Sequence, residues 1–157
     1  MTREAMAIEL IQKCEGFKSH AYQDSAGVWS IGFGSTRDLN GIKIQSNDIC
    51  LLYQAEQLLK NYLERNVYVS VKRMFIGTVE PIDEVFAALC SLAYNVGAKI
   101  TDDEDIKNAL HNNDLYALAD AFRKYIYVHV NGVATVCEGL VNRREIEINY
   151  FLGSVVA

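Results

Sequence analysis

The chain has 157 residues, of which half are hydrophobic, 22% are charged and one is a proline. This composition predicts one ordered globular domain that is long enough to bury a sizeable core, and it excludes a disordered tail. No apolar run approaches the roughly 18–20 residues that span a bilayer. The formal net charge of −5 argues against a nucleic-acid-binding protein, because no basic stripe is present to release counterions from phosphates.

The N-terminal sequence and the cysteines bear on the cellular compartment. The first 17 residues hold a short apolar run interrupted by Glu9 and Gln12, without a small-residue cleavage site, so no signal peptide is expected. The four cysteines form no CxxC pair, which excludes the usual spacing of zinc ligands. Two disulfides are arithmetically possible, but four reduced thiols are expected in a chain without an export signal. No metal or other cofactor is predicted.

The N-terminal part of the chain is predicted to change from helix to short strands. Apolar residues recur close to helical spacing over residues 2–14, and Gly16 stands where that helix would end. From Ala21 to Ile44 the sequence is rich in glycine and contains apolar residues suited to strands. This stretch therefore predicts tight turns and a small hairpin sheet.

The next predicted helix begins at Ser46, which precedes Asn47 and Asp48 as an N-cap with an acidic first turn. It would run to about Asn66. The side chains expected on its buried face are Leu51, Leu52, Ala55, Leu58, Leu59 and Tyr62. Residues from 47 onward are therefore assigned to a helical part of the chain.

Four further helices complete the prediction. The first starts at residues 80–83, with a proline in its first turn, and ends near Gly97. Two shorter helices follow at about 102–111 and 114–125, and the last begins after Gly139 and runs through Phe151. The predicted architecture is α+β, with a small sheet lobe and a larger, all-helical lobe.

Two acidic residues flank the change from helix to strand. Glu15 ends the first helix, where the negative end of the helix dipole favours a protonated carboxyl suited to general acid catalysis. Asp24 lies in a polar turn, where solvation and backbone donors favour the ionised form. Carboxyls in such different environments are typical of an acid and a base, and the hydroxyl of Ser30 could hold a water. The alternative is that all three are ordinary terminus, turn and strand residues.

The order of these residues favours the catalytic interpretation. Residues 15–36 closely resemble the active-site signature of bacteriophage lysozymes, the muramidase-type endolysins, which typically read E-G-x-x-x-x-x-Y-x-D-x-x-G-x-x-T-I-G-x-G-H. The positions in register are Glu15, Gly16, Tyr22, Asp24, Gly27, Ile31, Gly32 and Gly34. Residues 89–98 resemble the central helix of that family, and residues 138–144 resemble its G-L-x-x-R-R segment. The three motifs occur in the family's order and cover nearly the whole chain.

This resemblance implies a lysozyme-like fold with an active-site cleft between two lobes. Residues 1–157 would form one domain, with a β lobe at about 17–46 and a helical lobe from 1–16 and 47–157. Glu15 would protonate the glycosidic oxygen, Asp24 would position or activate a water, and Ser30 would replace the water-holding threonine.

The resemblance also implies residues that bind or position the substrate. Arg143 matches the arginine that pairs with the catalytic glutamate. Tyr22 and Gly34 would line the sheet side of the cleft, although Tyr22 could instead serve packing. Asn95 matches a polar residue near the cleft, or it simply ends its helix.

The implied function is hydrolysis of the β-1,4 linkage between N-acetylmuramic acid and N-acetylglucosamine in peptidoglycan, by an acid/base mechanism expected to be inverting. The enzyme would be a monomer that accumulates in the host cytoplasm without inserting into a membrane. It would need a separate, holin-type membrane-permeabilising protein to reach the wall in the periplasm.

Two departures from the family pattern are present. Ser30 keeps the hydroxyl of the usual threonine but loses the stiffness of a β-branched side chain, so weakened positioning of the water is expected. Ser35 replaces a histidine that serves a structural role in relatives. Two alternative functions remain open: a catalytically weak, wall-binding or tail-associated module, and a hydrolase directed at chitin or chitosan. Because both carboxyls are present, the active enzyme is favoured over the wall-binding module.

Overall fold

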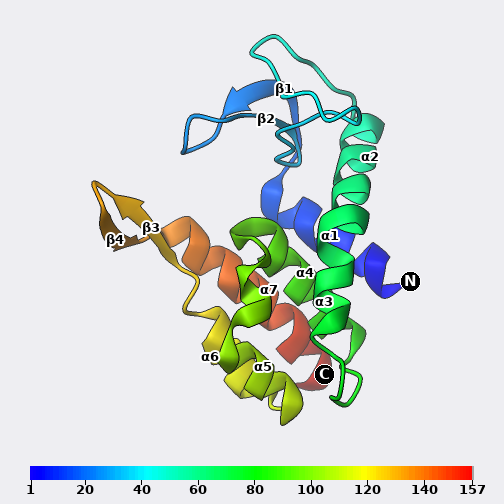
Figure 1. Ribbon diagram of the computed structural model, residues 1–157, viewed down its shortest axis with the longest axis vertical. Coiled ribbons are helices and arrows are strands. Elements are labelled where there is room, and N and C mark those ends of the chain that lie inside the picture. Colours follow the sequence, from blue (N-terminus) through cyan, green and yellow to red (C-terminus); the bar gives the residue numbers. More distant parts are fainter. Residues whose placement is uncertain (157) are drawn as a thin grey trace.

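A small lobe lies above a larger, mostly helical lobe in the computed structural model, which describes residues 1–156 (Figure 1). The predicted α+β class and the division into a small and a larger lobe are confirmed in outline. The last residue of the predicted domain, Ala157, lies outside the described residues. No helix among the described residues is long and apolar enough to cross a membrane.

Helix α1 (Arg3–Glu15) carries the chain to the junction of the lobes. The Thr2 side chain accepts a hydrogen bond from the Ala5 N–H at the start of the helix, and Gly16, at φ +69°, ends it as predicted. The buried face of α1 packs against the central helix of the large lobe. This packing fixes the C-terminal end of α1, and therefore Glu15, at the border between the lobes.

Strands β1 (Lys18–Gln23) and β2 (Trp29–Gly32) form the predicted antiparallel hairpin. Gly32 has φ +66°, and a Cβ added there would lie 2.8 Å from the Cβ of Ala55. Only glycine fits both the left-handed backbone and this close approach. The hairpin consequently lies directly against the helix that contains Ala55.

That helix, α2 (Leu52–Tyr62), begins later than predicted. The segment expected to be its first turn instead runs beside β1, because the Asp48 carbonyl accepts from the Ala21 N–H and the Cys50 N–H donates to the Ser19 carbonyl. The Asp48 carboxylate caps a turn by accepting from the Gln45 N–H, not a helix. Pairing with the sheet therefore outweighs the local N-cap signal.

The predicted buried face of α2 is only partly right. Ala55 and Leu59 are buried, but Leu51, Leu52 and Tyr62 are exposed. The helix runs from the small lobe down to the large lobe (Figure 1). The helix also continues past the predicted end. A π-helical segment, η1 (Leu63–Val67), leads into α3 (Tyr68–Arg73).

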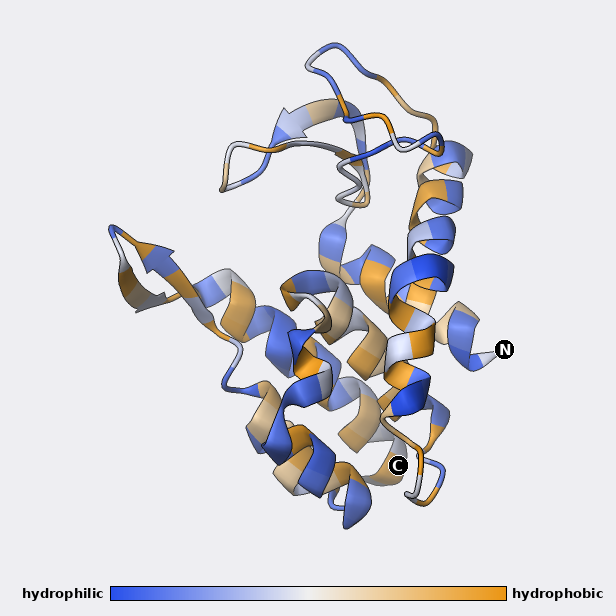
Figure 2. Ribbon diagram, in the orientation of Figure 1, coloured by the Kyte–Doolittle hydropathy of each residue, from blue (hydrophilic) through white to orange (hydrophobic). Residues whose placement is uncertain are grey.

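Helix α4 (Asp83–Val96) forms the centre of the large lobe, with nine consecutive buried residues from Val85 to Ala93. A helix that is buried on all sides is expected to be apolar around most of its surface, and this stretch is apolar except for Ser91 (Figure 2). It ends at Gly97, as predicted. Its proline precedes the N-cap Ile82 and does not lie in the first helical turn.

The remaining helices surround α4. A short 3₁₀ helix, η2 (Ala98–Asp102), leads to α5 (Glu104–His111) and α6 (Leu115–Phe122), close to the predicted positions. Asp103 and Asp114 cap α5 and α6, and each carboxylate accepts two backbone N–H groups. The last helix, α7 (Glu138–Val156), extends beyond its predicted end at Phe151. All four cysteines are free, as expected.

The large lobe is not all-helical, which corrects the prediction. Strands β3 (Tyr127–Val130) and β4 (Val133–Val136) form a second antiparallel hairpin that projects from the lobe (Figure 1). Asn131 and Gly132 both have positive φ, as a two-residue type I′ turn requires. Every residue from 127 to 136 is exposed.

Candidate active site

The carboxylate of Glu15 forms an ion pair with Arg143 at the junction of the lobes. The Glu15 Oε1 lies 2.5 Å from the Arg143 Nη1, and the Glu15 side chain is 21% exposed. The two residues are 128 positions apart, and they meet because α7 folds back beside the end of α1. The predicted pairing of Glu15 with Arg143 is confirmed.

The small lobe approaches the same carboxylate through Gly34. This glycine has φ +92°, and a Cβ added to it would lie 3.4 Å from the Glu15 Oε2. Tyr94 of α4 secures this approach, because its hydroxyl donates to the Phe33 carbonyl over 2.7 Å. Glu15 is thus placed between the two lobes, with Gly34 on one side and Arg143 on the other.

Behind Glu15 lies a buried ion cluster, which consists of Ser91, Arg143, Arg144 and Glu147. Glu147 is fully buried, and its Oε1 accepts from the Ser91 hydroxyl at 2.6 Å, from the Arg143 Nε at 3.2 Å and from the Arg144 Nη2 at 3.1 Å. Its Oε2 lies 2.7 Å from the Arg144 Nε, close enough for an ion pair although the alignment is not that of a hydrogen bond. One carboxylate therefore holds both arginines.

The two arginines of this cluster are balanced in formal charge by the carboxylates of Glu147 and Glu15 together. Burial alone would lower the pKa of Arg143, but the carboxylates of Glu15 and Glu147 outweigh it and raise that pKa. Burial lowers the pKa of Arg144, and Glu147 opposes this only in part. Burial also raises the pKa of the nearby Cys14 thiol, which therefore stays protonated and inert.

Asn95 belongs to the edge of this cluster. It lies in the last turn of α4, half-buried, and its Oδ1 accepts from the Arg144 Nη2 at 2.9 Å. The Arg144 Nη1 donates to the Tyr125 carbonyl at 3.0 Å. Asn95 therefore helps to fix Arg144, whatever it contributes to the cleft.

Asp24 is fixed by the turn between β1 and β2. Its Oδ1 accepts from the backbone N–H groups of Ala26 and Val28, each at 2.9 Å, in an exposed turn. These are the backbone donors that the polar sequence predicted. Burial raises the pKa of Tyr22, and the charges of Glu15 and Asp24 raise it further, so Tyr22 lies within range of both carboxylates.

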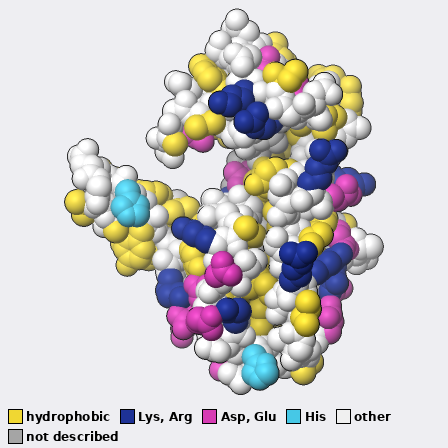
Figure 3. Space-filling view, viewed as in Figure 1, with side chains coloured by type: hydrophobic (Ala, Val, Ile, Leu, Met, Phe, Trp, Pro, Cys, Tyr) yellow, Lys and Arg dark blue, Asp and Glu magenta, His cyan; other side chains and the backbone are white. Residues whose placement is uncertain are grey.

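Ser30 lies on β2, opposite Tyr22 in the hairpin register. It is only 2% exposed, and its hydroxyl donates to the Val28 carbonyl at 3.3 Å. Ser30 and Asp24 therefore share Val28 as a backbone partner. The space-filling view shows a hollow below the small lobe, on the side toward which the β1–β2 hairpin extends (Figure 3).

Four residues of this arrangement were not predicted as site residues from the sequence: Ser91, Tyr94, Arg144 and Glu147. Spacing could have indicated Glu147, because it follows Arg143 by four residues and Arg144 by three on one helix. Within the described residues, no group of His, Cys, Asp and Glu side chains is arranged to hold a metal ion.

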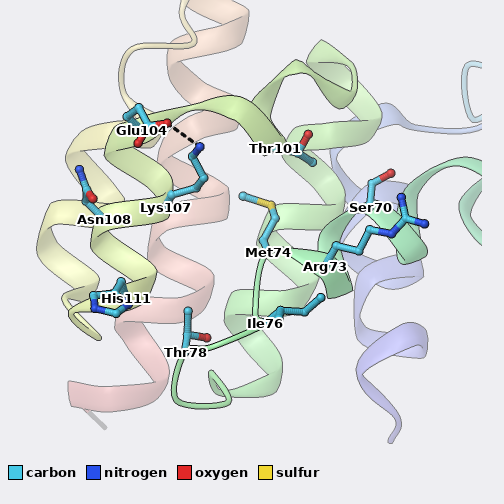
Figure 4. A pocket seen from close by; sticks show the side chains of 10 residues that line it. All are labelled: Ser70, Arg73, Met74, Ile76, Thr78, Thr101, Glu104, Lys107, Asn108 and His111. Atoms are coloured by element: carbon cyan, nitrogen blue, oxygen red, sulfur yellow. Dashed lines mark ion pairs between the residues drawn. The ribbon is translucent and has the colours of Figure 1, made fainter.

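A pocket of about 450 Å³ lies elsewhere, beside α3 and α5 (Figure 4). Its one carboxylate, Glu104, is paired with Lys107 over 2.5 Å, and none of the predicted site residues lines it. It therefore offers no second carboxyl and lacks a pair of carboxyls like Glu15 and Asp24. The chemistry of Glu15 and Asp24 is the better guide to the site.

The chain is similar to known proteins along nearly its whole length. The family model described as phage lysozyme matches residues 12–147. The endolysin of Acyrthosiphon pisum secondary endosymbiont phage 1 is 28% identical over 138 residues, which cover 88% of this chain and 89% of that protein. The solved endolysin from Escherichia coli O157:H7 phage FAHEc1 has a TM-score of 0.80 at 27% identity, covering 98% of this chain and 95% of the other. A solved point mutant of P22 lysozyme has a TM-score of 0.76 at 25% identity, covering 97% of this chain and 99% of the other.

Proposed function

Because the chain belongs to the phage lysozyme family and is a peptidoglycan-lysing endolysin, we propose that Glu15 is the acid that protonates the scissile glycosidic oxygen. The bond is the β-1,4 linkage between N-acetylmuramic acid and N-acetylglucosamine. One observation carries this assignment: Glu15 is the carboxylate that the buried ion cluster holds at the junction of the lobes, through Arg143.

The second carboxylate, Asp24, activates a water on the far side of the sugar ring. Two backbone N–H groups donate to its Oδ1 in the β1–β2 turn, so the Asp24 carboxylate is held in one position. Ser30 orients that water through its oxygen, since its proton is directed at the Val28 carbonyl. A water between two carboxyls implies a single displacement with inversion, and such enzymes keep the carboxyls about 6.5–9.5 Å apart.

Arg143 must release Glu15 before the acid acts, because its Nη1 occupies the Glu15 Oε1 in the ion pair. Arg143 can do so without losing its other partners: its Nε contacts the Glu147 Oε1 at 3.2 Å, and its Nη2 contacts the Ser91 hydroxyl at 3.2 Å. The substrate displaces the Glu15 contact, and Arg143 stays ion-paired with Glu147.

Three further residues complete the proposed substrate contacts. Tyr22 and Gly34 line the small-lobe wall, where Gly34 leaves room for a sugar beside Glu15. Asn95 supports the opposite wall through Arg144.

We further propose that the protein acts as a monomer, without a metal or other cofactor. It accumulates in the host cytoplasm and reaches the wall in the periplasm after a separate holin-type protein opens the membrane. The likeness to phage endolysins, along nearly the whole chain, supports this route.

The activity is tested by measuring new reducing ends released from purified peptidoglycan and, in parallel, from chitin. Release from peptidoglycan, with chitin cleaved far more slowly, is the expected result. Sedimentation of the protein with peptidoglycan without any release would support a wall-binding module instead, and equal cleavage of both polymers would contradict the assigned linkage.

Substitutions of Ser30 test the proposed water. Ser30→Thr should keep or raise activity, whereas Ser30→Val should lose much of it, because the hydroxyl and not the bulk orients the water. General acid–base positioning is worth roughly 10²–10⁴-fold, which bounds the loss. The measurement is the initial rate of reducing-end release. Equal rates for all three proteins would reduce Ser30 to a packing residue of β2.

A further inference from the structure

The β3–β4 hairpin has no partner within the described part of the chain. Residues 127–136 include six apolar side chains and no charged one, in a chain that is 22% charged. Val133 is 64% exposed, Val136 55% and Tyr127 52%. A two-stranded hairpin in water is marginally stable, and exposed edge strands usually carry lysine or proline. An apolar, uncharged arm of this kind indicates a binding surface.

The base of the hairpin is fixed to the candidate active site. Arg144 of the buried ion cluster donates to the Tyr125 carbonyl, two residues before β3, over 3.0 Å. The strands close with the Cys137 N–H donating to the Ile126 carbonyl at 2.8 Å, and α7 begins at the next residue. The helix that presents Arg143 to Glu15 therefore also carries the hairpin.

The hairpin stands beside the hollow of the molecule. It projects from the large lobe on the side toward which the β1–β2 hairpin also extends, and the space between these two projections is open (Figure 3). The register places Tyr127, His129, Ala134 and Val136 on one face of the hairpin and Val128, Val130, Val133 and Thr135 on the other.

We propose that the β3–β4 hairpin binds the glycan strand of peptidoglycan beyond the cleaved linkage, as an extension of the large-lobe wall. This proposal rests on the proposed function. Pyranose rings and acetamido methyl groups present C–H surfaces that pack on tyrosine and valine, and the acetamido groups can pair with the free edges of the strands. An uncharged arm also meets an anionic polymer without adding to the repulsion expected from the chain's net charge of −5.

Two other occupants fit less well. A second copy of the chain would need an interface of roughly 1,200 Å² or more, which two four-residue strands cannot supply alone. A membrane surface is usually bound by segments that combine apolar residues with lysine and arginine, and residues 127–136 contain neither.

The test compares two double variants, one for each face: Tyr127→Ser with Val136→Ser, and Val130→Ser with Val133→Ser. The control is Ile76→Ser with Val79→Ser, which removes two apolar side chains that are even more exposed, from the loop before α4. Each protein is measured for sedimentation with intact sacculi, and for cleavage of sacculi and of a glycan tetrasaccharide. Thermal unfolding is followed to verify that the variants stay folded.

At least one hairpin variant should bind sacculi about tenfold more weakly, as expected for the loss of one or two buried apolar contacts. The KM of that variant for sacculi should rise by a similar factor, while its cleavage of the tetrasaccharide stays unchanged. The control variant should match the unsubstituted protein in binding and in cleavage of both substrates. Unchanged sacculus binding by both hairpin variants would overturn the proposal, as would an equal loss on both substrates. If the unsubstituted protein bound sacculi but cleaved neither substrate, the proposed function would fail. The hairpin proposal would still stand if the hairpin variants then bound sacculi more weakly than the unsubstituted protein.

Discussion

Glu15→Gln is expected to abolish lysis of the cell wall while the protein stays folded. The amide is nearly the same size as the carboxyl but cannot donate a catalytic proton, and general acid catalysis of this kind contributes about 10²–10⁴-fold. The fold should persist, because the Arg143 guanidinium keeps its contacts with Glu147 and Ser91. Clearing of a turbid cell suspension measures the activity, and circular dichroism verifies the fold.

Glu9→Gln is the matched control, since it makes the same change on an exposed side chain of α1. This variant should clear the suspension at the unsubstituted rate. Near-normal clearing by Glu15→Gln would remove Glu15 from the mechanism.

Glu147→Gln is expected to cause the largest loss of stability. The substitution removes the carboxylate that contacts both Arg143 and Arg144. Arg143 keeps its ion pair with Glu15, but the buried Arg144 guanidinium loses its carboxylate partner. Breaking a buried ion pair by removing one partner costs about 3–5 kcal/mol of unfolding free energy. Urea denaturation measures this loss directly.

The matched control is Glu145→Gln, two residues away on the same helix, whose carboxylate is 45% exposed and pairs with Arg123. Surface ion pairs contribute about 0–1 kcal/mol. The urea concentration at the midpoint of unfolding should therefore be nearly the same for this variant as for the unsubstituted protein. Similar losses for the two variants would mean that Glu147 does not organise the cluster.

The local features of the fold follow from the sequence where one residue decides the conformation. Gly16 and Gly97 end their helices as predicted, since each adopts a positive φ that other residues disfavour. The predicted start of α2 was wrong, because there a contact between segments distant in the sequence decides the conformation. Ser46 and Asp48 form a good local N-cap signal, but backbone pairing of that segment with β1 is a tertiary interaction that no window of sequence contains.

The second hairpin was predictable and was missed. Asn131-Gly132 between alternating valines is among the strongest short-range signals of a type I′ hairpin. These residues fall between two stretches with helical periodicity, the second of which contains the motif at 138–144.

The candidate site likewise contains residues that the sequence predicted and residues that it did not. Glu15, Asp24 and Arg143 were predicted from the family resemblance, and the structure brings Glu15 and Arg143 into contact. Glu147 was not predicted, because a glutamate beside two arginines on a helix is typical of a solvated face. Its complete burial depends on α1 and α4 packing over α7, which the sequence pattern of α7 does not contain.

The proposed mechanism is tested most directly by the configuration of the first product. If Glu15 protonates the leaving oxygen while Asp24 directs a water to the opposite face, cleavage of the β-linked glycan must release the α-anomer. Proton NMR during the first minutes, before mutarotation, distinguishes the two anomers. The α-anomer is expected at the new reducing end. Initial release of the β-anomer, or a covalent glycosyl adduct trapped on Asp24, would contradict the inverting mechanism.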